Sequence, residues 1–189
     1  MRNINFKSIS VIFGAIGFIT IVIALHIVQS DYDSIHQLMS ELALGKHGSF
    51  MLIAFLSFSI SVFFAQSILV TYKNNLLARV LLIVASFSLA GAGLFKLGSH
   101  TELHISLVAL AFVLIVLSMY LIPRLILEFR NLVPIITCWG FGLGSSISVF
   151  LGQGFIPMGI AQRLAVSFIL IWLLWLAIFH QKQTWRQNV

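Results

Sequence analysis

The chain has 189 residues, of which 60% are hydrophobic and only 8% are charged, and its formal net charge is +6. Soluble domains are typically about 45–50% apolar and about 25% charged, so this composition excludes a water-soluble fold and predicts a chain surrounded by lipid. The eleven Lys and Arg residues are scattered singly rather than clustered, which argues against nucleic acid as a partner.

Six apolar runs follow one another along the chain, and each is long enough to cross a bilayer as a helix of about 20 residues. They cover roughly residues 8–28, 49–71, 76–97, 103–127, 132–152 and 160–180. The first run is too long for the core of a signal peptide and lacks a small-residue cleavage site, so we expect an uncleaved helix. Lipid offers the backbone no hydrogen-bond partners, so the spans must be helical. We therefore predict an all-α polytopic bundle of six transmembrane helices, forming a single integral membrane domain over residues 1–189.

Two stretches of small residues predict close contacts between helices. SLAGAG at 88–93 and GFGLGSS at 140–146 would let neighbouring helices approach closely. Cys138 is the only cysteine of the chain and falls within an apolar run, so we expect a small buried side chain rather than a disulfide.

Positive charges predict the orientation of the bundle, because Lys and Arg are enriched in cytoplasmic connections. Eight of them fall on one side of the predicted spans: Arg2, Lys7, Lys73, Arg79, Arg124, Arg130, Lys182 and Arg186. Three fall on the other: Lys46, Lys96 and Arg163. We expect a multi-pass protein of the cell inner (cytoplasmic) membrane, with both termini in the cytoplasm.

Most of the acidic and histidine residues fall on the predicted outer side. They are Asp31, Asp33, Glu41, Glu102, His26, His36, His47, His100 and His104. Ionisable groups at a membrane are costly to bury and are functional candidates for that reason. Their distribution predicts a polar pocket at the outer face.

The first outer connection, about residues 29–48, holds many of these groups. Asp33 can cap the start of a short helix, and Gly45 can end it. Apolar residues recur between them at three- and four-residue spacing: Ile35, Leu38, Met39 and Leu42. This pattern predicts a short re-entrant or interfacial helix at the outer mouth of the bundle.

Three motifs resemble those of a prokaryotic membrane-protein family catalogued as domain of unknown function 998. SELALG at 40–45, preceded by DYD at 31–33, is similar to the signature loop of that family. A histidine that opens the fourth span is matched by His104 (or His100), and a G-x-x-x-R motif before the last span is matched by Gly159 to Arg163.

The resemblance covers roughly residues 8–180 and has two departures. Ser34 stands where the family pattern has proline, and Gln162 stands where an acidic residue often precedes the arginine. The second departure removes a titratable partner. The resemblance implies a membrane architecture and carries no biochemical activity.

The SHTELH segment at 99–104 offers a pair of candidate metal ligands. In a helix that starts near Ser99, His100 and His104 would share one face and could bind one metal ion, with Asp33 and His36 as further ligands. The alternatives are handling of protons or a polar substrate and structural hydrogen bonding. Ser99 as a cap and Glu102 in the first turn are accounted for by the start of a helix.

Arg163, at the outer end of the sixth span, is a candidate binding residue together with Asp31 and His26. We expect the carboxylate of Glu41 to form a structural ion pair with Arg163. The alternative is that the guanidinium grips a lipid phosphate.

Two functions fit these residues. The leading hypothesis is a small membrane protein whose polar outer pocket binds a lipid or a partner, which could be another membrane protein or a second copy of the chain. The alternative is a metal-dependent hydrolase of a lipid or lipid-linked substrate, in which His100, His104, Asp33 and His36 hold zinc and activate water, assisted by Ser40 or Glu41. Charged residues and helix breaks are absent from the middles of the spans, which argues against a transporter or a channel.

Overall fold

A computed structural model describes residues 5–73 and 75–187 of the chain, and within these residues it contains helices and connecting loops. In this described part of the chain, six helices are long and apolar enough to cross a membrane. They are α1 (Phe6–Val28), α2 (Phe50–Leu69), α3 (Leu76–Leu94), α4 (Thr101–Leu125), α5 (Leu132–Leu151) and α6 (Met158–Gln187). The prediction of an all-α bundle with six membrane-spanning helices is confirmed.

The helix ends differ from the predicted ranges mainly at the last span. The helix α6 continues to Gln187 rather than ending near residue 180, because its polar last turns contain no glycine or proline to stop it. The helix α3 ends earlier than predicted, at Leu94, and the turn that follows contains Gly98 in the left-handed region, with φ of 93°.

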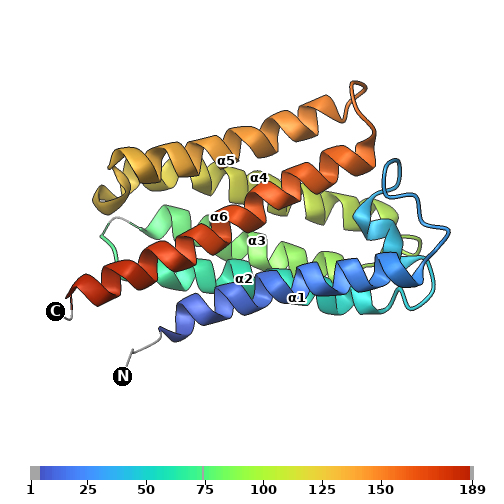
Figure 1. The fold of residues 1–189 in the computed structure, drawn as a ribbon, viewed down its shortest axis with the longest axis horizontal. Helices are drawn as coiled ribbons and strands as arrows, with labels where there is room; N and C mark the ends of the chain where they lie inside the picture. The colour runs from blue at the N-terminus through green and yellow to red at the C-terminus, as the bar shows by residue number, and fades with distance from the viewer. Residues whose placement is uncertain (1–4, 74, 188–189) are drawn as a thin grey trace.

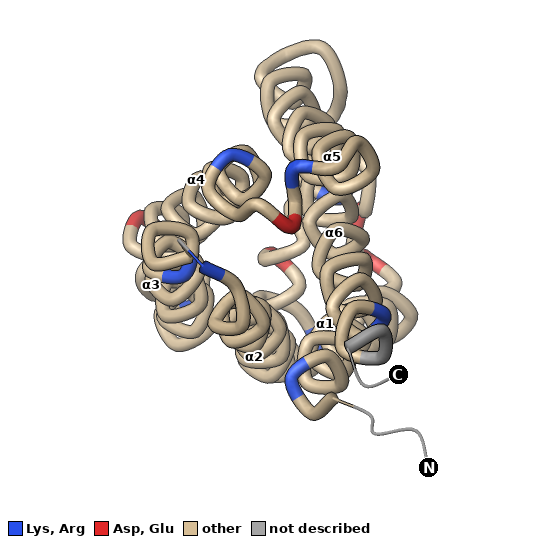
Figure 2. The backbone as a smooth tube through the Cα atoms, turned by 90° about the vertical axis from the view of Figure 1, so that its left-hand side faces the viewer, with Lys and Arg blue, Asp and Glu red and all other residues tan. Residues whose placement is uncertain are grey.

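The helices run back and forth along one axis, so both termini lie at one end of the bundle (Figure 1). We call this the termini end, and we call the opposite end, which carries residues 29–48, the loop end. Viewed from the termini end, the helices follow one another around a ring in chain order, and α6 closes the ring against α1 (Figure 2). Tight sequential packing of this kind follows from short connections between antiparallel neighbours.

Small residues bring neighbouring helices together, as predicted. A Cβ on Gly93 of α3 would lie 2.8 Å from the Cβ of Phe55 on α2, so only glycine fits there. Between α5 and α6, the Ser145 hydroxyl donates to the carbonyl of Ala165 at 2.8 Å. Cys138 is fully buried, as predicted, and its sulfur accepts a hydrogen bond from the Trp172 indole.

The outer surface of the bundle is apolar over the length of the helices. Large side chains point outward on different helices, among them Phe13 at 79% exposure and Phe87 at 67%. Lys and Arg residues lie near the helix ends, several of them at the termini end that faces the viewer in Figure 2. An apolar belt between charged ends is the surface expected of a protein that spans a bilayer. Arg2, one of the residues used to predict orientation, lies outside the described residues.

Candidate functional site

The connection between α1 and α2 covers the loop end of the bundle. The predicted re-entrant or interfacial helix is not confirmed, because the connection contains only the five-residue 3-10 helix η1 (Met39–Ala43). Met39 and Leu42 are buried as the apolar pattern predicts, but Ile35 is 47% exposed and lies outside the helix. Asp33 caps no helix, because its carboxylate accepts the backbone N–H of Ile35 within a turn.

The SELALG segment holds this loop in place. One oxygen of the Glu41 side chain accepts the N–H of Leu38 at 2.9 Å, which satisfies a free donor at the start of η1. The prediction that Gly45 ends a helix is wrong, because η1 ends at Ala43 with Leu44 as its C-cap. Gly45 instead leaves room for the Gln29 carboxamide, which a Cβ at this position would overlap. That carboxamide is buried and donates to the carbonyls of Leu42 at 2.9 Å and Lys46 at 2.8 Å.

The G-x-x-x-R motif at the start of α6 binds the same loop. A Cβ on Gly159 would lie 2.5–2.8 Å from three carbonyl oxygens of the loop, so glycine is required for this contact. The absence of a side chain lets the N–H of Ile160 donate to the carbonyl of Ile35. One residue before the arginine, the Gln162 Oε1 atom accepts the N–H of Met39 at 2.6 Å. An oxygen acceptor is what an acidic residue would also supply, so this departure from the family pattern preserves the contact.

Arg163 connects α6, α1 and the loop through neutral partners. Its guanidinium donates to the carbonyls of Gln37 and Gly159, to the Tyr32 hydroxyl at 2.5 Å and to His26 Nε2 at 3.1 Å. The predicted ion pair with Glu41 does not form, because carbonyl, phenol and imidazole acceptors surround the guanidinium.

Tyr32 and His26 complete this cluster. The guanidinium of Arg163 lies 5.5 Å from the centre of the Tyr32 ring, and the His26 ring packs edge-on against that same ring. Burial raises the pKa of Tyr32, while the hydrogen bond and charge of Arg163 oppose the rise. The Tyr32 hydroxyl donates in turn to the carbonyl of Leu38 at 2.8 Å. The cluster is a closed set of satisfied hydrogen bonds that fastens the loop to two helices.

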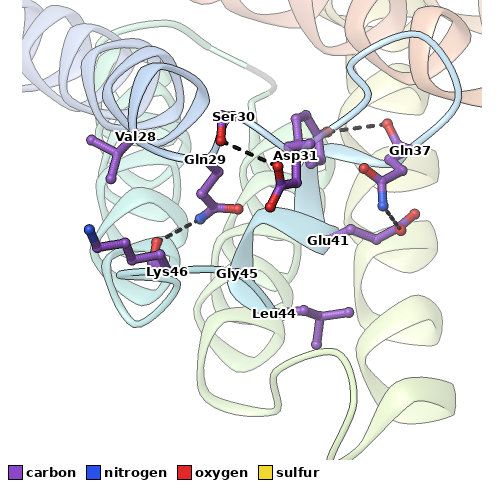
Figure 3. Close-up of a pocket in the computed structure, with 10 residues that line it drawn as sticks. Val28, Gln29, Ser30, Asp31, Gln37, Glu41, Leu44, Gly45 and Lys46 are labelled. Carbon is purple, nitrogen blue, oxygen red and sulfur yellow. Dashed lines mark hydrogen bonds between the residues drawn. The ribbon is translucent and has the colours of Figure 1, made fainter.

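A cavity of about 440 Å³ opens beside the loop and contains the predicted candidate Asp31 (Figure 3). The hydrogen bonds around it join Ser30 to the Asp31 carboxylate and the Gln37 amide to Glu41 (Figure 3). In the described part of the chain, no hydrogen bond joins Asp31 to His26 or Arg163, which contact each other.

The two histidines of SHTELH have different environments. The helix α4 begins at Thr101, so His100 precedes it as the exposed N-cap residue and does not share a helix face with His104. Ser99 does not cap the helix, since its hydroxyl donates to the carbonyl of Lys96. Glu102 lies in the first turn, as predicted. His104 is only 2% exposed and packs edge-on against Phe55.

The proposed metal ligands are brought together only in part. His36 Nδ1 lies 2.6 Å from an Asp33 carboxylate oxygen in an exposed pair, and this hydrogen bond lowers the pKa of Asp33. Across the described residues, no group of three or more His, Cys, Asp or Glu side chains is arranged to hold a metal ion. Metal ligation by these residues stays a prediction.

A second cavity, which we call the lateral groove, runs between α4, α5 and α6 towards the loop end and has a volume of about 420 Å³. Its lining is formed by Leu38, Ser40, His104, Ile105, Val108, Ala109, Phe112, Val113, Val149, Met158, Ala161, Gln162, Ala165 and Val166. Ile105 and Val113 are at least half exposed, so the groove opens on the apolar outer surface. Its polar residues are Ser40, His104 and Gln162, at the end covered by the loop.

The sequence did not single out the groove, although two of its lining residues were candidate functional residues. Ser40 was considered as a catalytic candidate and His104 as a metal ligand, whereas the structure places both at the end of an apolar channel. The apolar lining could not be distinguished from ordinary lipid-facing residues in the sequence. Only the packing of α4, α5 and α6 distinguishes the residues that line the groove from those that simply face lipid.

The termini end has its own polar cluster. The Asn5 amide donates to His180 Nε2 at 3.0 Å, and the Tyr72 hydroxyl lies 3.5 Å from His180 Nδ1, beside a cavity of about 210 Å³. Burial, reinforced by the negative charge of Glu128, raises the pKa of Tyr72 to about 12. This cluster joins the start of α1 to α6 and the end of α2.

Comparisons with known proteins bear on the family and not on an activity. A search of curated proteins and a search of solved structures returned no match. Residues 12–178, which contain all three motifs described above and most of each of the six helices, match the family described as "Protein of unknown function (DUF998)". The chain is therefore a multi-pass, membrane-type helical protein that belongs to the DUF998 family.

Proposed function

We propose that this protein binds a membrane lipid in the lateral groove, with the acyl chain along α4 and α6 and the polar part of the lipid beneath the loop. The observation that carries the proposal is the asymmetry of the groove. Its length is lined by apolar side chains, while Ser40, His104 and Gln162 gather at the loop end alone. A lipid has the same division into an apolar chain and a polar head.

The size and lining of the groove support this proposal. Ligand cavities typically have volumes of about 300–1,000 Å³ and are mainly apolar, with a few polar groups that orient the ligand. The groove has about 420 Å³ and opens at residues such as Val113 and Val149, which lie on the apolar outer surface. A lipid of the surrounding bilayer would enter sideways, without passing through water.

A lipid explains the groove better than a partner protein. Ser40 and His104 are 4% and 2% exposed, so they lie below the surface that a partner helix could touch. A thin acyl chain and its first polar groups can reach such a position. A partner helix that covered the groove would leave these polar groups beneath it without new hydrogen bonds.

The proposal includes an orientation in the membrane. The sequence has eight Lys and Arg residues on one side of the predicted spans and three on the other, and from this count the positive-inside rule assigns both termini to the cytoplasm of the cell. The polar end of the groove would then lie in the outer leaflet of the cytoplasmic membrane. A reporter domain fused after Val189 should stay cytoplasmic, and a reporter active on the outer side would reverse the assignment.

The test is the lipid content of the purified protein, measured by mass spectrometry after gentle detergent extraction. Ala109→Trp would fill the groove from an exposed position, and Val84→Trp on α3 is the matched control on the outer surface away from the groove. We expect wild type and Val84→Trp to retain bound lipid and Ala109→Trp to lose it. An equal lipid content in all three proteins would contradict the proposal. It would also be contradicted if wild type and Val84→Trp were dimers and Ala109→Trp were a monomer, since the groove would then be covered by a second copy of the chain.

A further inference from the structure

The hydrogen bonds of His104 define which of its ring nitrogens carries the proton. His104 Nδ1 lies 2.8 Å from the carbonyl oxygen of Ala92 and 3.1 Å from that of Phe95, at the end of α3. Carbonyl oxygens only accept hydrogen bonds, so Nδ1 must be the donor. In the neutral ring, Nε2 is then an acceptor with a free lone pair.

That acceptor has no partner within the protein. The Nε2 atom of His104 is buried, and among the described residues nothing donates a hydrogen bond to it. Leaving a buried acceptor unsatisfied is unfavourable, so most buried polar atoms in proteins have a partner or a bound ligand. Because Nδ1 is held against α3, Nε2 lies on the other side of the ring, and His104 lines the loop end of the lateral groove.

Two further polar groups at this end have unused hydrogen-bonding capacity. The Ser40 hydroxyl is nearly buried and makes no hydrogen bond to any described residue. Gln162 uses Oε1 to accept the N–H of Met39, which leaves its Nε2 amide hydrogens as free donors. The residues that line this end of the groove thus hold one unpaired acceptor, one amide donor and one hydroxyl, which can donate or accept.

The groove contains no charged residue. None of its fourteen lining residues is Lys, Arg, Asp or Glu, so it has no partner for a phosphate or for an ammonium group. A charged head group would lose its hydration there without compensation. The recognised polar group should therefore be neutral.

From these features we infer that the lipid of the lateral groove is a neutral lipid with a free hydroxyl, of the diacylglycerol class. The inference rests on the proposed function and names its ligand. The hydroxyl of the lipid donates to His104 Nε2, and an ester carbonyl accepts from the Gln162 amide. Ser40 can donate to the second ester or accept from the hydroxyl.

The test compares two lipids that differ in one hydrogen-bond donor. A photoactivatable diacylglycerol is bound to the wild-type protein in detergent and displaced by dioleoylglycerol, by its O-methyl ether or by dioleoylphosphatidylglycerol. Loss of one buried hydrogen bond corresponds to about a tenfold loss of affinity. We therefore expect dioleoylglycerol to compete at about one tenth of the concentration that the methyl ether requires. The phospholipid should compete less well still.

Variants connect this preference to the histidine. His104→Leu should bind both neutral lipids equally, and Ala109→Trp should bind neither. Because the comparison within wild type needs no variant, a poorly folded His104→Leu protein would not remove the test.

The outcomes separate this inference from the proposed function. Equal competition by dioleoylglycerol and its methyl ether would overturn the hydroxyl contact. A water molecule would then be the hydrogen-bond donor to His104 Nε2. Stronger competition by the phospholipid would overturn the neutral head group. In either case, loss of probe binding in Ala109→Trp would leave lipid binding in the groove standing. If the diacylglycerol probe does not bind at all, the inference fails, and the lipid content of the purified protein decides the proposed function by itself.

Discussion

Replacing Gly159 with alanine should loosen the loop from α6. The added Cβ would lie 2.5 Å from the carbonyl oxygen of Gln37, 2.6 Å from that of Ile35 and 2.8 Å from that of Ser34. Real Cβ atoms do not approach backbone oxygens so closely, and a backbone cannot rotate away as a flexible side chain can. The loop must move outward as a unit.

The cost of this movement follows from the contacts that hold the loop at this point. Three of the hydrogen bonds between the loop and α6 are made by loop residues 35–39, beside the clash: Ile160 N–H to Ile35, Met39 N–H to Gln162, and Arg163 to the Gln37 carbonyl. At about 0.5–1.5 kcal/mol each, their loss would cost roughly 1.5–4.5 kcal/mol. Alanine recovers about 1 kcal/mol relative to glycine in a helix, so we expect Gly159→Ala to destabilise the protein by roughly 0.5–3.5 kcal/mol.

The matched control is Gly140→Ala in α5. A Cβ on Gly140 would meet nothing within 4 Å, so the same substitution there should be neutral or stabilise the protein by up to about 1 kcal/mol. Unfolding in mixed micelles with increasing denaturing detergent, followed by circular dichroism, gives both free energies. Limited proteolysis of residues 29–48 should also accelerate in Gly159→Ala alone. If both variants shifted stability in the same direction, the assigned role of Gly159 would be wrong.

Three further predictions follow from other contacts. Arg163→Lys should destabilise the protein by about 2–3 kcal/mol, as much as Arg163→Gln does. The reason is that an ammonium cannot replace a guanidinium that donates to four acceptors in different directions. Full stability of the lysine variant in the same unfolding assay would contradict this role. The pKa of Tyr72 is raised to about 12 in the folded state, against about 10 in an unfolded chain. The contribution of Tyr72 to stability is therefore intact below pH 10 and is lost as the pH rises from about 10 to about 12. Ultraviolet titration of tyrosinate should show a component with a pKa of about 12 that Tyr72→Phe removes. His36→Ala should raise the pKa of Asp33, observed by NMR titration of a labelled carboxyl, because the hydrogen bond from His36 is the largest cause of its lowered value; an unchanged titration would show that the pair does not persist in solution.

The helices were predictable because their cause is local. An apolar run of about 20 residues in lipid has one satisfactory backbone conformation, so composition along the chain suffices. The burial of Cys138 and the close approach at Gly93 follow from the same kind of reasoning, because small apolar residues within a span are useful mainly for packing.

The contacts of the loop were not predictable in the same way. Glu41 was expected to pair with Arg163 because their charges are opposite, but the guanidinium is occupied by backbone carbonyls and by neutral Tyr32 and His26. Every residue has the same backbone carbonyl, so the sequence does not indicate which carbonyls will surround a given side chain. The exact start of the fourth span was also not predictable, because the helix begins at Thr101, one residue after His100, rather than near Ser99.

Mapping the attachment sites of a photoactivatable acyl chain tests the central claim, lipid binding in the lateral groove, most directly. A lipid with a diazirine near the end of its chain is incubated with the wild-type protein in bilayers, and labelled peptides are identified by mass spectrometry. The account predicts labels concentrated on groove residues such as Phe112 and Val166, and their loss in Ala109→Trp. Labels spread evenly over the outward-facing side chains of all helices, such as Phe13 and Phe87, would contradict it.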